Sequence, residues 1–176
     1  MNQRSRGNTA QGDFDALFDN YAERVYRWAL FLGLAAGDAE EITQEVFVTV
    51  FKKKERPQTD HVLAAYLFQI TRRHVANHRR SGWVKRVFGM ANDAIESAVD
   101  ADAGGVAGDV MQNAAMRQVF KQLPIKWGEV LLLHDLEGYS RREIARILGI
   151  AEGTVASRLR YARAAFIEKW TEQSHA

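Results

Sequence analysis

The chain has 176 residues, of which 47% are hydrophobic and 26% are charged, and its formal net charge is +2. It contains no cysteine, which excludes disulfides and thiolate zinc sites, and its only prolines are Pro57 and Pro124. This length and apolar fraction are sufficient for two small helical domains. Strand-like alternation between turn signals is missing, which argues against a sandwich or a barrel and favours an all-α fold.

We do not expect the beginning of this sequence to act as a targeting signal. Residues 1–14, MNQRSRGNTAQGDF, lack the apolar segment that a secretory signal peptide needs. No later apolar run approaches the length that spans a membrane. We therefore expect a cytoplasmic protein without membrane insertion, whose residues 1–11 form a flexible N-terminus.

The first predicted domain, residues 12–89, opens with two apolar stripes at helical spacing. The first stripe predicts a core helix that ends before Gly33, and it consists of Phe14, Leu17, Phe18, Tyr21, Val25, Trp28, Ala29 and Leu32. Asp38 can cap a second helix, whose acidic beginning suits the helix dipole. Its expected inward positions are Ile42, Val46 and Val50, with Phe47 and Phe51 as further candidates.

Residues 52–86 form a basic block. They contain ten Lys or Arg residues and two acids, a net charge of +8, which indicates a phosphate-binding surface. Charge and Pro57 interrupt the helical pattern between Lys52 and Asp60, so we expect an exposed basic loop there. A third helix should then run from about Val62 to Arg80, with Leu63, Leu67, Ile70 and His74 along its inner side.

The third helix carries a polar face that indicates binding to unpaired nucleic acid. This face consists of Gln69, Arg72, Arg73, Asn77 and Arg80. Tyr66 and Phe68 add aromatic rings near the start of the helix. Cations hold a phosphate backbone while rings stack on splayed bases, at about 1–3 kcal/mol per stack. Packing of either ring into the core is an equally good interpretation, because one sequence does not show which ring is exposed.

A linker separates the two predicted domains. Residues 90–113 carry five acids and neither Lys nor Arg, a net charge of −5. The stretch 103–108, AGGVAG, has too little apolar mass to form a core. We therefore place a flexible acidic linker at residues 90–112 and a second helical domain at residues 113–172.

Residues 137–163, EGYSRREIARILGIAEGTVASRLRYAR, have the pattern of a helix-turn-helix. Ser140 with Glu143 three residues later predicts a capping box at the start of the first helix. Gly149 permits the left-handed turn between the helices. In the second helix the expected buried stripe consists of Val155, Leu159, Ala162, Phe166 and Trp170.

The opposite side of that second helix indicates contact with a DNA groove. It presents Ala156, Ser157, Arg160, Tyr161 and Arg163. Arg is the commonest bidentate reader of guanine, hydroxyl groups bond base edges or phosphates, and a methyl group can touch thymine. The alternative is a merely solvated basic helix face.

The sequence offers no catalytic or metal site. His74 and His78 are four residues apart and could share a helix face as metal ligands, but no nearby acid or third histidine completes such a site. A nucleophile with its base and a phosphate-cradling glycine loop are also missing. We expect a protein that is not an enzyme and that holds no cofactor and no metal.

Both predicted domains resemble bacterial RNA polymerase sigma factors of the extracytoplasmic-function group, which keep only sigma regions 2 and 4. The segment DAEEITQEVFVTVFKK resembles the helix that docks on the clamp helices of the polymerase largest subunit. The segment AAYLFQITRRHVANHRR resembles the helix that melts and reads the minus-ten element. The segment that begins LPIKWGEVLLLHDLEGYS and continues to Phe166 resembles the region that binds the minus-thirty-five element.

The resemblance implies three sets of binding residues. The polymerase-binding set is Asp38, Glu40, Glu41, Gln44 and Glu45. The minus-ten set is Lys54, Arg56, Tyr66, Phe68, Gln69, Arg72, Arg73, Asn77 and Arg80. The minus-thirty-five set is Arg142, Thr154, Ala156, Ser157, Arg158, Arg160, Tyr161 and Arg163.

The resemblance also implies the function and the partners. The protein is expected to bind core RNA polymerase, through the largest-subunit clamp helices and the flap, and promoter DNA. An anti-sigma factor is the expected inhibitor and could hold the protein at the inner membrane face. Two other classes stay open: a polymerase-independent helix-turn-helix regulator with a sensing or dimerising N-terminal domain, and a helical adaptor that binds only protein. The first leaves the basic third helix without a role.

Overall fold

The computed structural model describes residues 4–53, 55–87 and 107–174. These residues form helices and connecting turns without any strand, so the predicted all-α class is confirmed. The elements are α1 (Arg4–Phe31), α2 (Ala36–Phe51), α3 (Asp60–Val87), α4 (Ala107–Gln122), α5 (Ile125–Leu131), the π-helical turn η1 (Leu132–Leu136), α6 (Arg141–Leu148) and α7 (Glu152–Ser174). None of the helices in the described part of the chain combines the length and apolar character needed to cross a membrane.

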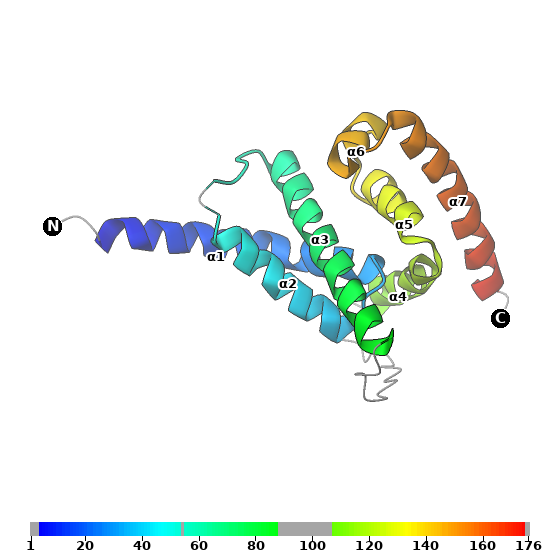
Figure 1. Ribbon diagram of the computed structural model, residues 1–176, viewed down its shortest axis with the longest axis horizontal. Helices are drawn as coiled ribbons and strands as arrows, with labels where there is room; N and C mark the ends of the chain where they lie inside the picture. Colours follow the sequence, from blue (N-terminus) through cyan, green and yellow to red (C-terminus); the bar gives the residue numbers. More distant parts are fainter. Residues whose placement is uncertain (1–3, 54, 88–106, 175–176) are drawn as a thin grey trace.

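Helices α1, α2 and α3 form an N-terminal bundle (Figure 1). The stripe on α1 buries Val25, Trp28 and Ala29, as its spacing predicts. The inward residues of α2 are also buried, namely Ile42, Val46, Phe47 and Val50, whereas Phe51 is exposed and touches Phe14 edge-on. Each large apolar side chain buried in this way contributes about 1.5–3 kcal/mol relative to an exposed one.

The turn between α1 and α2 depends on Gly33. Its φ of +89° lies in the left-handed region that glycine adopts without strain. The Arg79 guanidinium lies over this glycine and donates to the carbonyl of Leu32, so a Cβ on residue 33 would lie 2.5 Å from Arg79 Nη2. The backbone conformation therefore requires glycine here, and a Cβ would in addition displace the flexible end of the Arg79 side chain.

Several helix boundaries differ from the sequence predictions. Helix α1 already begins at Arg4 and α4 at Ala107, so both extend into segments expected to be flexible. No proline interrupts either extension, and lengthening an existing helix adds one hydrogen bond per residue. Asp38 does not cap α2, because the helix begins at Ala36, with Ala35 as its N-cap. Asp38 instead lies in the first turn, where a carboxylate suits the helix dipole.

Helices α4 to α7 form a C-terminal bundle whose core includes Val119, Val130, Leu133 and Ile144. The predicted capping box of α6 is confirmed, with Ser140 N to Glu143 Oε2 at 2.9 Å and Glu143 N to Ser140 Oγ at 3.3 Å. Gly149 ends α6 with φ +67°, as the turn requires. The helix-turn-helix geometry of α6 and α7 follows from these two local signals.

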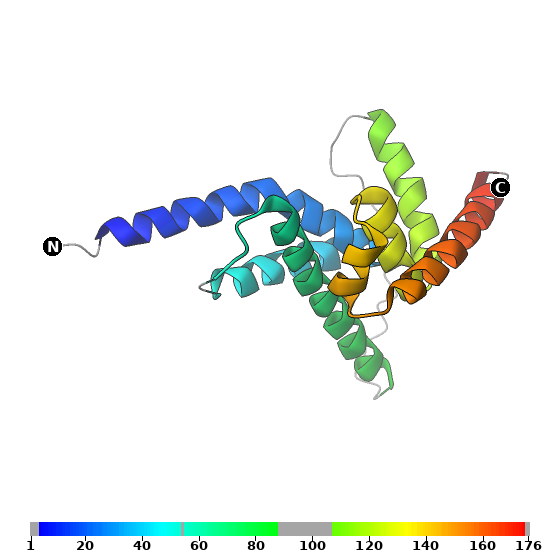
Figure 2. The same ribbon diagram turned by 90° about the horizontal axis from the view of Figure 1, so that it is seen from above.

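The two bundles pack against each other. Figures 1 and 2 place α5 and α6 beside the N-terminal half of α3, while α4 lies against α1. Phe31 at the end of α1 packs edge-on against Phe120 of α4, with ring centroids 4.8 Å apart. One continuous set of buried side chains therefore runs through both bundles.

Candidate nucleic-acid interface

Helix α7 presents the polar face expected from its sequence. Val155, Leu159 and Ala162 are buried, which turns the opposite side of the helix outward. On that side Ser157, Arg160, Tyr161 and Arg163 are exposed, while Thr154, Ala156 and Arg158 are half-buried. Arg142, from the first turn of α6, is exposed as well.

Arg160 and Tyr161 form one unit on this face. The Arg160 guanidinium carbon lies 4.8 Å from the centroid of the Tyr161 ring, and Arg160 Nη2 donates to Tyr161 Oη at 3.0 Å. Tyr161 in turn stacks on Trp127 of α5. The guanidinium is thereby oriented before any ligand binds, which lowers the entropy lost on binding.

A shallow groove runs beside Arg160. It is lined by His134, Arg141, Ala156, Leu159, Arg160 and Arg163. His134 and Arg141 were not among the residues proposed from the sequence. Arg141 follows the capping residue Ser140 directly, and a basic residue at the exposed start of this helix is the signal that could have found it.

Arg163 has an acidic partner within the protein. It donates to Asp135 of η1 through Nε at 2.9 Å and through Nη2 at 2.5 Å. The bond from Arg163 is the main cause that lowers the pKa of Asp135, and the same carboxylate raises the pKa of Arg163. Arg163 is therefore less free to meet a phosphate than Arg160.

The exposed side of α3 carries a second polar face, in the N-terminal bundle. Gln69, Arg73, Asn77 and Arg80 are exposed along it at intervals of three and four residues. In the preceding loop Arg56 is half-buried, and Lys54 lies outside the described residues. This face is cationic and polar, as the sequence predicted.

Phe68 does not belong to that face. Its side chain is fully buried and packs edge-on against Trp28, with ring centroids 5.5 Å apart. The prediction that Phe68 contacts DNA is therefore wrong for this structure. The cause is its position on α3, one residue after the fully buried Leu67, on the side that faces α1.

Tyr66 is half-buried and differs from Phe68. The ammonium of Lys53 lies 5.6 Å from the centroid of its ring. Its hydroxyl oxygen is buried and finds no hydrogen-bond partner among the described residues. Such a group is costly unless water or a ligand satisfies it.

Gln69 and Arg72 contact the C-terminal bundle. Gln69 Nε2 donates to the Ile147 carbonyl at 2.9 Å, and Arg72 Nε donates to Glu129 Oε1 at 2.5 Å. Glu129 is only 4% exposed, so the ion pair stabilises a carboxylate that water barely reaches. Two residues of the predicted minus-ten set are thus already bonded within the chain.

Helix α2 presents the acidic face expected to bind a protein. Glu40, Glu41, Gln44 and Glu45 are exposed, and Asp38 is half-buried. Two histidines of α3 reach this face: His74 Nδ1 lies 2.8 Å from Glu45 Oε2, and His78 Nε2 lies 3.4 Å from Asp38 Oδ2. Acids do lie near both histidines, contrary to the sequence interpretation. Even so, no three metal-ligating side chains gather anywhere in the described ranges.

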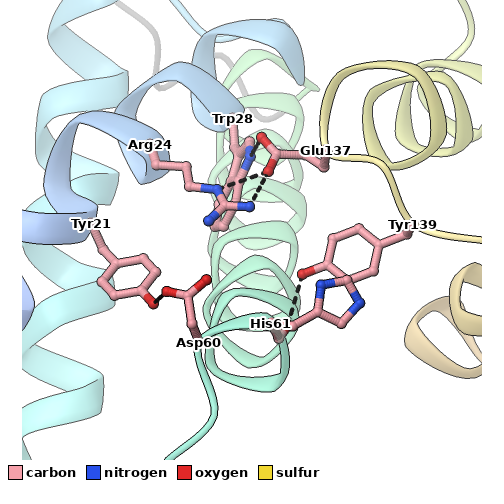
Figure 3. Close-up of polar contacts among 7 residues, drawn as sticks. All are labelled: Tyr21, Arg24, Trp28, Asp60, His61, Glu137 and Tyr139. Atoms are coloured by element: carbon pink, nitrogen blue, oxygen red, sulfur yellow. Dashed lines mark hydrogen bonds and ion pairs between the residues drawn. The ribbon is translucent and has the colours of Figure 1, made fainter.

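The sequence did not predict the polar cluster between the bundles (Figure 3). Glu137 accepts from Arg24 Nε at 2.8 Å and from Trp28 Nε1 at 2.6 Å. Tyr139 donates to the His61 carbonyl at 2.9 Å, and the rings of Tyr139 and His61 lie 4.3 Å apart. Beside them Tyr21 donates to Asp60, and burial together with this bond raises the pKa of Tyr21 to about 12.

Comparisons with known proteins agree with this arrangement. Residues 17–84 match the family Sigma-70 region 2, and residues 113–166 match Sigma-70, region 4. The ECF RNA polymerase sigma factor SigL of Mycobacterium tuberculosis is 30% identical over 148 residues, which cover 84% of this chain and 82% of SigL. SigE of Mycolicibacterium smegmatis is 31% identical over 156 residues, which cover 88% of this chain and 60% of SigE.

Two solved structures share the fold. The sigma factor RpoE in complex with the anti-sigma factor NepR from Bartonella quintana matches with a TM-score of 0.67 at 23% identity, over 90% of this chain and 97% of that one. CnrH in complex with the cytosolic domain of CnrY matches with a TM-score of 0.60 at 20% identity, over 90% and 87%. The family resemblance found in the sequence is confirmed. The chain therefore belongs to the ECF family of RNA polymerase sigma factors.

Proposed function

We propose that this sigma factor reads a promoter at two places, with the α7 face on minus-thirty-five duplex and the α3 face on the unpaired minus-ten strand. The proposal rests chiefly on one observation: two separate polar, cationic helix faces occur in the order of sigma regions 2 and 4. Each face alone offers only a few contacts. Joined in one chain, they bind together more tightly than either does alone.

The C-terminal bundle supplies the contact with paired DNA. In a helix-turn-helix the second helix enters the major groove while the first crosses the backbone. On α7 the pre-oriented Arg160 suits the acceptor edge of guanine, and the half-buried Ala156 suits a thymine methyl. Thr154, Ser157, Arg158, Tyr161 and Arg163, together with Arg141 and Arg142, supply contacts to bases or phosphates around them.

The N-terminal bundle supplies the contact with the melted strand. Arg73, Asn77 and Arg80 line the exposed side of α3 and suit a phosphate backbone. Tyr66 suits a base, because its ring is partly accessible and its hydroxyl lacks a partner in the described structure. Gln69, Arg72 and the loop residues Lys54 and Arg56 complete the proposed set, from which Phe68 is removed.

The acidic face of α2 is the proposed surface for core RNA polymerase. Asp38, Glu40, Glu41, Gln44 and Glu45 cover it, and they suit a basic or polar surface on the clamp helices of the largest subunit. The polymerase flap is the proposed partner of the C-terminal bundle.

An inhibitory protein is the third proposed partner. RpoE and CnrH are both described in complex with a second protein, which for RpoE is an anti-sigma factor. We propose a partner of this kind for this chain. It would keep the factor inactive in the cytoplasm or at the inner membrane face.

Reconstituted transcription tests the proposal. The purified protein is mixed with core RNA polymerase, re-isolated by gel filtration and assayed for run-off transcription from its mapped promoters. Co-elution and promoter-dependent transcripts are the expected result. Duplex binding without transcription would instead support a polymerase-independent regulator, and neither activity would support an adaptor that binds only protein.

A further inference from the structure

We infer that His134 is a positioning residue for Arg163: when its imidazole gains a proton, Arg163 is released toward DNA, and the minus-thirty-five surface binds duplex more tightly. The inference rests on the proposed function of α7 and adds a control by pH. A cluster of three side chains carries it, namely His134 and Asp135 of η1 and Arg163 of α7.

The three side chains of this cluster share hydrogen bonds beside the groove next to Arg160, which His134 and Arg163 both line. His134 Nδ1 lies 2.7 Å from Asp135 Oδ1, and Arg163 Nη2 lies 2.5 Å from the same oxygen. Arg163 Nη2 also lies 3.2 Å from His134 Nδ1 itself. One ring nitrogen is therefore within hydrogen-bond distance of both the acid and the guanidinium.

The π-helical turn η1 brings this pair of neighbours to α7. The backbone N–H of Glu137 donates to the carbonyl of Leu132, five residues earlier, at 3.0 Å. Turns of this kind are rare and are frequently found at functional sites. Here the turn allows two consecutive side chains, His134 and Asp135, to contact the same arginine.

The proton on Nδ1 decides which of these contacts His134 makes. A neutral imidazole with its proton on Nε2 presents Nδ1 as an acceptor, whereas a protonated imidazole donates from both nitrogens. In the neutral form Nδ1 accepts from Arg163, which Asp135 also holds through two bonds. In the charged form Nδ1 donates to Asp135 instead. Protonation thus removes an acceptor from Arg163 and places a cation beside it, while Asp135 keeps a positive partner.

The acid and the arginine of the cluster keep their charges near neutral pH. The bond from Arg163, helped by the bond from His134, lowers the pKa of Asp135. The bond with Asp135 raises the pKa of Arg163. An imidazole is the side chain that ordinarily changes its charge between about pH 5 and about pH 8.

The surroundings of His134 link its proton to DNA. The packed helices α6 and α7 line the same groove with three cations, namely Arg141, Arg160 and Arg163. Helix α5 contributes no titratable side chain to that groove within the described ranges. On its other flank Asp135 borders a separate groove, to which α4 contributes only apolar side chains. A duplex bound to the cations brings phosphates near His134, and their charge favours the protonated imidazole. By reciprocal linkage, protonation then favours binding of the duplex.

NMR spectroscopy of the full chain tests the coupling without DNA. A ¹⁵N-labelled sample reports the ring nitrogens of His134 and the Nε–H group of Arg163 in one pH titration. We expect both signals to follow one shared curve, and the Arg163 signal to stay constant in His134→Gln. An Arg163 signal that does not respond to pH, or that responds equally in His134→Gln, would overturn the inference.

Duplex binding by the holoenzyme gives the functional readout. The probe is a fluorescein-labelled duplex of about 20 base pairs that carries only the minus-thirty-five element of a mapped promoter, so that strand opening does not contribute. Uptake of one proton limits the gain in affinity to about tenfold per pH unit. We expect the original protein to bind this duplex about three- to tenfold more tightly at about pH 6 than at about pH 8.

Four variants locate the origin of this ratio. His134→Gln stays neutral and should bind equally at both pH values, near the weaker affinity, whereas the permanently charged His134→Arg should stay near the tighter one. Arg163→Ala should lose most of the gain, because His134 acts through it. Glu172→Gln, an exposed residue at the end of α7, is the control and should keep the full ratio. Circular dichroism checks that each variant keeps its helices.

The outcomes separate this inference from the proposed function. A full ratio in His134→Gln would overturn the inference. A full ratio in Arg163→Ala would overturn it as well, because His134 would then contact DNA directly. A holoenzyme that binds no promoter duplex at either pH would refute the proposed function, and the NMR titration would still decide whether His134 controls Arg163.

Discussion

Arg163 of α7 and Asp135 of η1 form a bidentate ion pair, with distances of 2.9 Å and 2.5 Å between donor and acceptor atoms. Arg160, one turn earlier on the same helix, has no acidic partner among the described contacts and rests on the Tyr161 ring. Two arginines of one helix face therefore differ in their freedom to bind DNA.

This difference predicts unequal effects of two matched substitutions. Arg160→Ala should weaken binding of a minus-thirty-five duplex by about 1–3 kcal/mol, because a free guanidinium can read a base. Arg163→Ala should weaken it less and should instead lower the free energy of unfolding by about 0.2–1 kcal/mol, the range for an exposed pair. Fluorescence anisotropy and urea unfolding measure the two quantities. Equal losses of DNA affinity would contradict the distinction, and Lys169→Ala on the same helix is the control.

The α3 face yields a second prediction. Arg73→Ala combined with Arg80→Ala should reduce promoter opening by the holoenzyme, as permanganate reactivity of unpaired thymines reports, while duplex binding by the C-terminal bundle stays unchanged. Both side chains are exposed, so the fold should tolerate their loss. Parallel loss of opening and of duplex binding would point to misfolding instead.

Arg72→Ala should behave differently from that pair. The substitution leaves the buried Glu129 carboxylate without its ion-pair partner. Breaking a fully buried pair lowers the free energy of unfolding by about 3–5 kcal/mol. The loss should be smaller here, because the Arg72 side chain is 42% exposed. Thermal unfolding should therefore show a lower midpoint for Arg72→Ala than for Arg73→Ala. The opposite order would argue against the pair with Glu129.

The capping box predicts a pH dependence of stability. Hydrogen bonds from the Ser140 hydroxyl and backbone N–H, followed by the contact with His61, lower the pKa of Glu143 to about 2 from an ordinary value of 4.5. A carboxyl group with a lowered pKa in the folded state stabilises the protein above its ordinary pKa. This contribution is lost as the pH falls from about 4.5 towards about 2.

Comparison with Glu143→Gln isolates this contribution. Glutamine keeps the capping geometry without the charge, so the difference in free energy of unfolding should be largest near neutral pH and should vanish towards about pH 2. Glu168→Gln, exposed on α7, is the control. A difference that stays constant from about pH 5 to about pH 2 would show that the carboxylate form is not the one that is bonded.

The turn after α1 gives a fifth prediction, with a matched glycine as control. Gly33→Ala forces a Cβ into a left-handed conformation and against the Arg79 guanidinium, so it should lower the free energy of unfolding by about 1 kcal/mol or more. Gly37→Ala meets open space in the first turn of α2 and should be neutral or slightly stabilising. Urea unfolding measures the free energy of unfolding of both variants. Equal losses in Gly33→Ala and Gly37→Ala would show that the left-handed conformation of Gly33 does not matter for stability.

Local features of this chain were predictable from its sequence. The spacing of Val25 and Trp28, the Ser140–Glu143 capping box and Gly149 each act over a few residues, and the structure confirms all of them. The exposed polar faces of α3 and α7 follow from the same helical periodicity.

Contacts between distant segments were not predictable in this way. Glu137 bonds Arg24 across 113 positions of sequence, and Glu129 bonds Arg72 across 57. No periodic pattern encodes such pairs. The rotation of α3 about its axis relative to α1 decides whether Tyr66 or Phe68 enters the core. The spacing of residues within α3 does not fix this rotation.

Footprinting of the reconstituted holoenzyme on a mapped promoter tests the central claim most directly. We expect DNase I protection of the duplex around minus thirty-five, together with permanganate-reactive thymines around minus ten. Protection and reactivity should then both depend on this protein. Contact confined to one of the two elements would contradict the account.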